Sequence, residues 1–383
     1  MNRIILFSAQ TCPFGDAGAT RLHYLAKLFE LINYNPTIVG ICSNSDEGFG
    51  AEKVTDGITY HFFEAHNRNY LPQVRRYLKA NEGISAVLVY SIPLNALVFL
   101  KKYTCKHNIL LLHDSVEWYS KSEFRHALIS YEYWRKELYN RIFIDKSFKV
   151  IGISSYLCSH FSNRGIQTLR IPAILDVRNR VFEKNIKSEY IIIAYIGGYA
   201  PTKDQLDVFL KSYIKMDSKT KEKIRLWFIG MSTDQVASIA GIDVSVVSEM
   251  HCISCFGKVK RDKLLEMMKE VDYTILIRRA GERYSQAGFP TKVVESLASA
   301  TPVIANLTSD LGFYLQDGIN SFVLKDLEPS YIEQFLKDLA QNLQIGQRME
   351  MANFARRTAD KYFDYSVYRD ALMKLIGGNN ENF

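Results

Sequence analysis

Short apolar runs alternate with amphipathic stretches along this chain of 383 residues. The apolar runs are rich in β-branched residues and end at polar or glycine-rich positions, which predicts buried strands. In the first half they cover 3–7, 37–42, 86–90, 108–114, 149–153 and 166–171. In the second half they cover 190–196, 225–230, 253–257, 273–277 and 303–305. Strands that alternate with helices in this way predict an α/β fold with parallel sheets.

Helical periodicity fills most of the intervals between these runs. The clearest helical stretches are 22–29, 71–80, 258–269 and 362–376. The aromatic and basic stretch 124–148 is predicted as one long helix, which suits either domain packing or a lipid interface. A polar, glycine-rich loop is expected up to Gly57. The length fits two domains of ordinary size. We expect the first over 1–180 and the second over 181–361, with a polar hinge at 172–188.

The composition indicates a folded chain with a basic first half. Hydrophobic residues make up 47% and charged residues 23%, which excludes a disordered chain. Residues 1–185 contain 23 Lys and Arg against 16 Asp and Glu, a net charge of +7, whereas residues 186–383 contain 25 of each. This asymmetry favours an anionic partner such as membrane lipid or a phosphate-bearing acceptor, or else a solvated basic face. No module for nucleic acid is recognisable, so we expect no nucleic-acid partner.

The basic charge gathers on one predicted helix. In 71–80, Arg75, Arg76 and Lys79 lie opposite the apolar positions, which fits either an exposed face or an anionic membrane surface. No segment is long and apolar enough to span a bilayer, and the apolar start is too short for a signal peptide. We therefore expect a cytoplasmic protein, peripheral to the inner face of the membrane. The isolated Cys252-x-x-Cys255 pair predicts no metal or redox site.

One stretch in the second half carries the strongest candidate chemistry. Gly288-Phe289-Pro290 predicts a tight turn, and a helix is expected to open at Thr291. The first N–H groups of a helix have no intrahelical partners and bind anions, and Lys292 in the first turn suits an anion there. Glu295, one turn later, is placed to accept hydrogen bonds from ribose-like hydroxyls. The alternative is an ordinary connection between a helix and a strand.

The same residues resemble a known family. The stretch resembles the donor-site signature of the retaining, family 4 (group 1) type of GT-B glycosyltransferases. The resemblance is carried by residues 288–292, by Glu295 and by the Thr-Pro-Val-Ile of 301–304. The Ala-Gly-Phe-Pro-Thr-Lys variant resembles a bacterial exopolysaccharide or capsule branch. The usual signature has a glutamate where Ala287 stands and a glycine where Pro290 stands, and these departures concern contacts to the transferred sugar more than contacts to the nucleotide.

The resemblance implies a fold and a set of donor contacts. The fold implied is two Rossmann-like domains that face across a cleft, with a C-terminal helix in 362–383 that crosses back to the first domain. Gly197, Gly198 and Lys203 resemble a strand–glycine–lysine element whose lysine pairs with the donor diphosphate. Arg278, with Arg279 and Arg283 as alternatives, would supply a second cation. Lys203 and Lys292 are then catalytic, and the implied donor-binding residues are Gly197, Gly198, Arg278, Gly288, Phe289, Pro290, Thr291 and Glu295.

The first half resembles the family more loosely. Gly15 and Gly18 lie in a loop that resembles the loop through which the family meets its acceptor, and Asp114 to Tyr119 resembles an acceptor-side motif. His113 and Asp114 also end a predicted strand, where open parallel sheets bind ligands. The implied acceptor-binding residues are Gly18, Arg21, Asp114 and Glu117. His113 is the third catalytic candidate, although the residue by itself fits a structural role.

The expected reaction needs no metal. The chain has no Asp-x-Asp pair to hold a metal ion, so the charge on a leaving nucleoside diphosphate would be stabilised by Lys203, Lys292, Arg278 and the helix start. The resemblance implies transfer of a hexose, with retention and no cofactor, from a nucleotide-diphosphate sugar (UDP favoured) to a saccharide or lipid-linked acceptor. The alternative, motivated by Ala287, is a non-catalytic GT-B-shaped partner or regulator of another glycosyltransferase.

Overall fold

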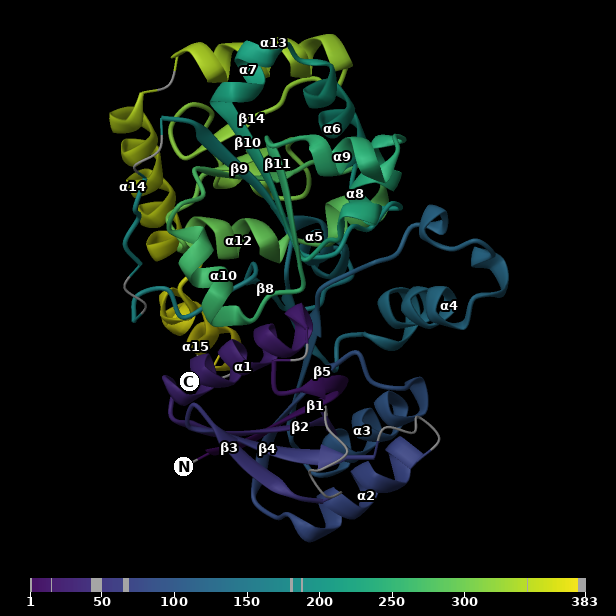
Figure 1. The fold of residues 1–383 in the computed structure, drawn as a ribbon. Helices are drawn as coiled ribbons and strands as arrows, with labels where there is room; N and C mark the ends of the chain where they lie inside the picture. Colours follow the sequence, from purple (N-terminus) through teal and green to yellow (C-terminus); the bar gives the residue numbers. More distant parts are fainter. Residues whose placement is uncertain are drawn as a thin grey trace. The chain divides into compact units, whose positions relative to one another are not determined.

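The computed structural model describes residues 2–14, 16–42, 50–64, 69–179, 182–186, 189–342 and 344–377. Gly15 lies outside these ranges. The chain divides into two compact units, each built on one sheet (Figure 1). The first unit contains Met1–Asp176, Ala287–Phe289 and Asp364–Phe383, and the second contains Val177–Gln286 and Pro290–Phe363. The expected α/β fold with two parallel-sheet, Rossmann-like domains is confirmed.

The first unit is built on an eight-stranded sheet in the order β3-β4-β2-β1-β5-β6-β7-β8. Every neighbouring pair is parallel except β3 and β4. The strands are β1 Asn2–Cys12, β2 Tyr34–Cys42, β3 Glu52–Thr55, β4 Ile58–Phe63, β5 Ile84–Tyr90, β6 Leu110–Ser115, β7 Lys149–Gly152 and β8 Thr168–Arg170. Successive residues of β1 and β5 are buried because helices cover both faces of the sheet.

Two predictions about the secondary structure of the first unit were wrong. The loop expected up to Gly57 contains β3, which pairs with β4 through a tight turn. Asp56 and Gly57 both adopt positive φ, of 51° and 78°, which suits a two-residue hairpin turn. The sequence pattern missed β3 because three of its four residues are exposed.

The long helix expected over 124–148 is also broken into short pieces. The 3₁₀ turns Lys121–Glu123 and Ala127–Ile129 come first, followed by α4 (Tyr131–Leu138) and a π-helical turn at Tyr139–Phe143. Ser130 starts α4, because its hydroxyl accepts from the N–H of Tyr133 at 3.3 Å. Arg164 donates to the carbonyls of Asn140 and Ile144 and so ends the helical run.

The remaining helices of the first unit cover its sheet. They are α1 Ala17–Glu30, α2 Tyr70–Ala80, α3 Leu94–Lys106, α5 Ser155–Ser162 and α15 Arg369–Gly377. The stretch 362–376, expected as one helix, is instead a 3₁₀ turn at Tyr365–Tyr368, capped by the Asp364 side chain, followed by α15. The preceding helix, α14 (Ile345–Tyr362), ends in the second unit. No helix in the described residues is long and apolar enough to cross a membrane.

The second unit is built on a six-stranded, all-parallel sheet in the order β11-β10-β9-β12-β13-β14. The strands are β9 Ile191–Ile196, β10 Ile224–Ile229, β11 Ile253–Gly257, β12 Tyr273–Leu276, β13 Val303–Ala305 and β14 Ser321–Val323. The helices are α6 Leu206–Lys215, α7 Ser218–Lys223, α8 Thr233–Ala240, α9 Val244–Glu249, α10 Arg261–Met268, α11 Arg283–Ala287, α12 Thr291–Ala298, α13 Pro329–Asn342 and α14.

The strand order reverses direction once in each sheet. From β9 the chain runs outward through β10 and β11, and it then returns to the other side of β9 with β12. The corresponding point in the first sheet lies between β1 and β5. At such a switch point the connections leave in opposite directions and open a crevice beyond the carboxyl ends of the strands. The topology therefore gives each unit one preferred place for a ligand.

Candidate functional site

The switch point of the second unit is surrounded by residues that follow β9 and β12. Gly197 comes directly after β9 and has a φ of 91°, a value that favours glycine. A Cβ on Gly197 would lie 3.3 Å from Cε of Lys292, and one on Gly230 would lie 3.0 Å from Cα of Gly197. The positive φ explains the glycine at position 197, and a side chain at position 230 would meet the backbone of Gly197.

A buried carboxylate organises the cations at this point. Asp204 is almost fully buried and accepts a hydrogen bond of 2.7 Å from the hydroxyl of Tyr195. Nζ of Lys292 lies 3.9 Å from the same carboxylate and 3.1 Å from the Tyr195 hydroxyl, to which it donates. Nε of Arg278 lies 3.6 Å from the other carboxylate oxygen. Lys292, Arg278, Asp204 and Tyr195, which we call the cation cluster, come from four separate parts of the chain.

The cation cluster carries more positive than negative charge. Two cations face one carboxylate, and Glu295, which also influences Lys292, is exposed. Burial lowers the pKa of Lys292, with Asp204 opposing that effect and Arg278 adding to it. Among the described residues, Nε of Arg278 and Oδ1 of Asp204 have no hydrogen-bond partner. Such a cluster would gain stability from an added anion.

The backbone of Arg278 is fixed by a residue that follows the next strand. Asn306 comes directly after β13, and its Oδ1 accepts from the Arg278 N–H at 2.9 Å. Its Nδ2 donates to the Arg278 carbonyl at 2.7 Å. Both bonds hold the start of the Arg278 side chain at the end of β12. Asn306, Tyr195 and Asp204 are not among the predicted site residues, although a polar residue directly after a strand is the signal that fits Asn306.

Lys203 lies one residue before Asp204 in the chain. Its Nζ lies 5.7 Å from the ring centroid of Tyr284, a cation–π distance. The Tyr284 hydroxyl donates to the backbone carbonyls of Thr202 and Lys203 at 3.2 and 3.3 Å. The loop after β9 is thereby attached to α11. Lys203 is half-buried.

The start of α12 has the features expected of an anion-binding helix end. The helix begins at Thr291, and no side chain in the described residues caps its first N–H groups. Pro290 is buried and Thr291 half-buried, so the turn is fixed by packing. Gly288 and Phe289 are grouped with the first unit, and Phe289 is buried. Among the predicted donor residues, the structure thus brings Gly197, Gly198, Arg278 and Lys292 together.

In the first unit the structure places three predicted site residues in the interior. Arg21 and Asp114 form an almost fully buried ion pair, with Nη2 and Oδ1 at 2.8 Å, and Nη1 of Arg21 donates to the carbonyl of Pro172 at 2.6 Å. The pair joins α1 to β6. His113 is buried too, with Nδ1 3.3 Å from the carbonyl of Val89, and burial lowers its pKa to about 3. These contacts give all three residues a structural role.

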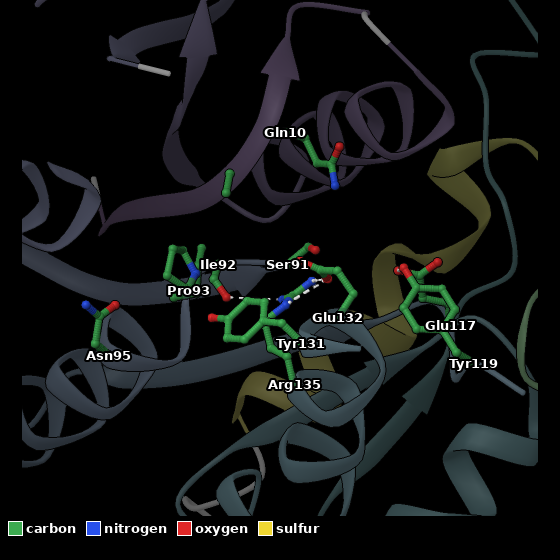
Figure 2. A pocket seen from close by; sticks show the side chains of 11 residues that line it. Gln10, Ser91, Ile92, Pro93, Asn95, Glu117, Tyr119, Tyr131, Glu132 and Arg135 are labelled. Atoms are coloured by element: carbon green, nitrogen blue, oxygen red, sulfur yellow. Dashed lines mark hydrogen bonds and ion pairs between the residues drawn. The ribbon is translucent and has the colours of Figure 1, made fainter. Parts of the chain in front are cut away.

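Gly18 has a similar packing role, since a Cβ there would lie 2.2 Å from the Tyr90 hydroxyl. Glu117 differs from the other predicted acceptor residues because it lines a pocket of about 680 Å³ in the first unit (Figure 2). The pocket lies at the switch point between β1 and β5. Its walls are Ala9, Gln10, Ser91, Ile92, Pro93, Asn95, Glu117, Tyr119, Tyr131, Glu132 and Arg135.

Ion pairs hold the charged walls of the pocket in place. Arg135 donates to Oε2 of Glu132 through Nε at 3.0 Å and Nη2 at 2.6 Å, and these bonds are drawn in Figure 2. Glu117 accepts from the Tyr119 hydroxyl at 2.8 Å and lies 3.3 Å from Nζ of Lys136. The pocket therefore offers hydroxyl, amide and carboxylate groups, and its one lining cation is already paired. Such walls suit the hydroxyl groups of a sugar.

The described residues contain no group of three His, Cys, Asp or Glu side chains that could hold a metal ion. Cys252 and Cys255 are free thiols. The charged groups at the switch point of the second unit are thus organised by one carboxylate and by backbone contacts.

Comparisons with known proteins agree with this geometry. Residues 190–342 match the family described as glycosyl transferases group 1. An uncharacterised glycosyltransferase of Methanocaldococcus jannaschii is 22% identical over 271 residues, which cover 66% of this chain and 64% of that protein. Anabaena HepE, solved with UDP and glucose, has a TM-score of 0.68 at 14% identity and coverage of 98% of this chain and 99% of HepE.

A second solved structure shows the same fold. The sucrose-phosphate synthase of Thermosynechococcus elongatus has a TM-score of 0.70 at 12% identity, with 99% of each chain covered. At such identities the structural likeness establishes the fold. This chain has the GT-B fold, and the sequence of its residues 190–342 is similar to the group 1 glycosyltransferases.

Proposed function

We propose that this chain is a metal-independent, retaining hexosyltransferase of the family 4 type that uses a UDP-sugar. The observation that carries the proposal is the cation cluster, in which Lys292 and Arg278 face a single buried carboxylate at the switch point of the second sheet. A pyrophosphate bound there would neutralise the excess charge. HepE, which shares the fold, was solved with UDP and glucose, and this supports a uridine nucleotide as the donor.

The proposed step is a front-face displacement. A hydroxyl oxygen of the acceptor forms a bond to the anomeric carbon while the bond from that carbon to the phosphate oxygen breaks. The acceptor proton passes to the departing phosphate oxygen, so no protein base is required. Negative charge grows on the diphosphate, and Lys203, Lys292, Arg278 and the first N–H groups of α12 would stabilise it. Glu295, exposed on α12, would accept hydrogen bonds from the ribose.

We propose that the pocket of the first unit takes the acceptor. The pocket is lined by amide, hydroxyl and carboxylate groups and by two tyrosines, and its Arg135 is paired with Glu132. This lining favours a saccharide acceptor, free or lipid-linked. A saccharide acceptor fits an enzyme that takes part in the synthesis of a bacterial exopolysaccharide or capsule. The basic surface of the first half would add attraction to an anionic membrane, on its cytoplasmic side.

The test is release of UDP from a panel of UDP-hexoses, with saccharide acceptors, in the presence and absence of a chelator. Transfer that persists with the chelator and yields a product of retained anomeric configuration is expected. Loss of transfer on chelation would contradict metal independence. A non-catalytic regulator, suggested by Ala287 in place of the usual glutamate, would bind UDP in a thermal-shift assay and release none from any donor.

A further inference from the structure

The segment from Arg125 to Ile142 exposes several large apolar side chains and buries several charged ones. Five large hydrophobic side chains are exposed, with Ile129 at 82% and Trp134 at 46% exposure. The five, which we call the apolar ledge, are Leu128, Ile129, Tyr131, Trp134 and Ile142. On the other side of the same segment Arg135, Lys136 and Glu137 are buried. This arrangement is the reverse of an ordinary surface helix.

The inverted orientation is fixed by the buried charges. Lys136 lies 3.3 Å from Glu117, and Arg135 pairs with Glu132 and donates to the carbonyl of Ile92 at 3.3 Å. Glu137 accepts from the indole N–H of Trp118 at 2.9 Å. Turning α4 over would break the contacts of these charged side chains with Glu117, Trp118 and the carbonyl of Ile92, and the loss of such contacts inside the unit opposes the burial of the apolar side chains. The exposure of the ledge is therefore built into the unit.

Three polar groups within or beside the ledge have hydrogen-bond partners. The indole N–H of Trp134 donates to the carbonyl of Leu128 at 2.8 Å, which ties α4 to the 3₁₀ turn before it. The N–H of Ser130 bonds to the carbonyl of Ala127 at 3.2 Å, and the Ser130 hydroxyl caps α4. An apolar medium could cover this surface without leaving those donors without a hydrogen-bond acceptor. Figure 1 shows α4 and the turns before it projecting from the strands of their own unit.

The charges around the ledge indicate what covers it. Residues 121–142 contain five Lys and Arg against three Glu, a net charge of +2. Lys121, Arg125 and Arg141 are exposed beside the ledge. Basic side chains next to Trp, Tyr and long aliphatic residues are typical of segments that lie in the interface of an anionic bilayer.

We propose that the apolar ledge inserts into the surface of an anionic phospholipid bilayer. Helix α4 has 8 residues, so it would lie in the interface and not span the membrane. Helix α2 contributes charge but no apolar anchor, because Val74, Tyr77 and Leu78 are buried while Arg75 and Arg76 are exposed. Insertion of the apolar ledge into the bilayer thus differs from the electrostatic attraction of an anionic membrane to the basic face of α2.

The ledge and the pocket share one helix. Tyr131 belongs to the ledge and also lines the pocket, next to Glu132 and Arg135 (Figure 2). Docking through the ledge would therefore hold the mouth of the pocket at the lipid surface, where a saccharide on a lipid carrier is presented. This last step rests on the proposed transferase function, whereas insertion itself requires no substrate.

The experiment is flotation of the full chain with vesicles of phosphatidylcholine and phosphatidylglycerol, and with phosphatidylcholine alone. We expect binding to the anionic vesicles, lowered at least tenfold by Leu128→Ser with Ile129→Ser, since each loses the burial of a large side chain. The matched control is Val244→Ser with Val246→Ser, two exposed apolar residues on α9 of the second unit, and should bind like wild type.

Trp134 provides a direct readout of insertion. Trp118 is buried and Trp227 half-buried, so Trp134 is the exposed one of the three tryptophans. Its emission should shift to the blue with anionic vesicles and be quenched by brominated lipid, and Trp134→Phe should abolish both signals. The proposal is overturned if the chain does not float, if the Leu128/Ile129 variant floats like wild type, or if the ledge is covered instead by a second copy or a partner protein.

A parallel thermal-shift titration with UDP separates this proposal from the proposed function. Variants of the ledge that keep the UDP-induced shift are folded, so their loss of vesicle binding is attributable to the ledge. Wild-type chain that binds vesicles but shows no UDP shift would contradict the donor site and leave the ledge supported.

Discussion

Nζ of Lys292 donates to the hydroxyl of Tyr195 at 3.1 Å, and the same hydroxyl donates to buried Asp204 at 2.7 Å. The tyrosine thus lies between a cation and a carboxylate and keeps the two apart. Lys292 also lies 4.5 Å from the ring centroid of Tyr195, so the ring positions it as well as the hydroxyl. This relationship orients the lysine without neutralising it completely, which is what a diphosphate site needs.

Lys292→Ala and Arg278→Ala should each lower kcat/KM for UDP release. By analogy with the loss of one donor to a developing anion, we expect a decrease of about a hundred- to a thousand-fold. Initial-rate kinetics with a UDP-hexose measure it. Lys219→Ala, on the exposed surface of α7, is the control and should leave the rate unchanged. Activity within about threefold of wild type in both site variants would remove the proposed phosphate site.

Tyr195→Phe should affect both stability and UDP binding. Asp204 loses a hydrogen bond while buried, which should cost about 1–3 kcal/mol of unfolding free energy in a urea titration. UDP affinity should fall several-fold because Lys292 loses its anchor. Tyr213→Phe is the matched control, since its hydroxyl donates to the carbonyl of Ile224 at 2.7 Å away from the cation cluster. It should lose similar stability and keep its UDP affinity; equal affinity in both variants would argue against the anchor.

Arg21→Ala should destabilise the first unit strongly. Asp114 would remain buried without its partner, at a cost of about 3–5 kcal/mol. A lower Tm in calorimetry is the measure. The double variant Arg21→Met with Asp114→Leu removes both charges and should recover much of that loss. If Arg21→Ala keeps its Tm but loses acceptor binding, the residue contacts the acceptor as the family resemblance implied.

His113 should make the folded chain less stable in acid. Its pKa is lowered from its ordinary value near 6.5 to about 3, with burial as the main cause and Lys136 as a further one. Between these values the unfolded chain binds a proton that the folded chain does not, so stability falls as the pH drops below 6.5, by at most about 1.4 kcal/mol per pH unit. His113→Gln should flatten this slope in urea titrations at successive pH values.

The same substitution tests the catalytic assignment of His113. A neutral, buried imidazole exchanges no proton with a substrate near neutral pH, so the pH–rate profile of His113→Gln should keep the limbs of the wild-type profile. Loss of one limb in the variant, with a retained Tm, would support a catalytic role instead.

The sequence by itself predicted most of the strands, since apolar runs and turn residues act locally, although it missed β3 and the breaks in the helix expected over 124–148. It also predicted glycines and cations for a donor site, because Gly197, Lys203 and Lys292 lie within motifs only a few residues long. Asp204, Tyr195 and Asn306 lacked such a local pattern. Their roles depend on strands that become neighbours only when the parallel sheet forms, with β12 beside β9 and β13 beside β12.

Only the tertiary structure decided which polar side chains are exposed and which are buried. His113, Arg21 and Asp114 end or adjoin strands, as ligand-binding residues often do, but α1 and the strands around them enclose all three. The aromatic and basic composition of 124–148 suited either domain packing or a lipid interface. In the structure, Glu117 and Trp118 hold Lys136 and Glu137 on the inner side of α4. Pairing a buried charge takes precedence over burying an apolar side chain, and partners distant in the chain determine where that pairing occurs.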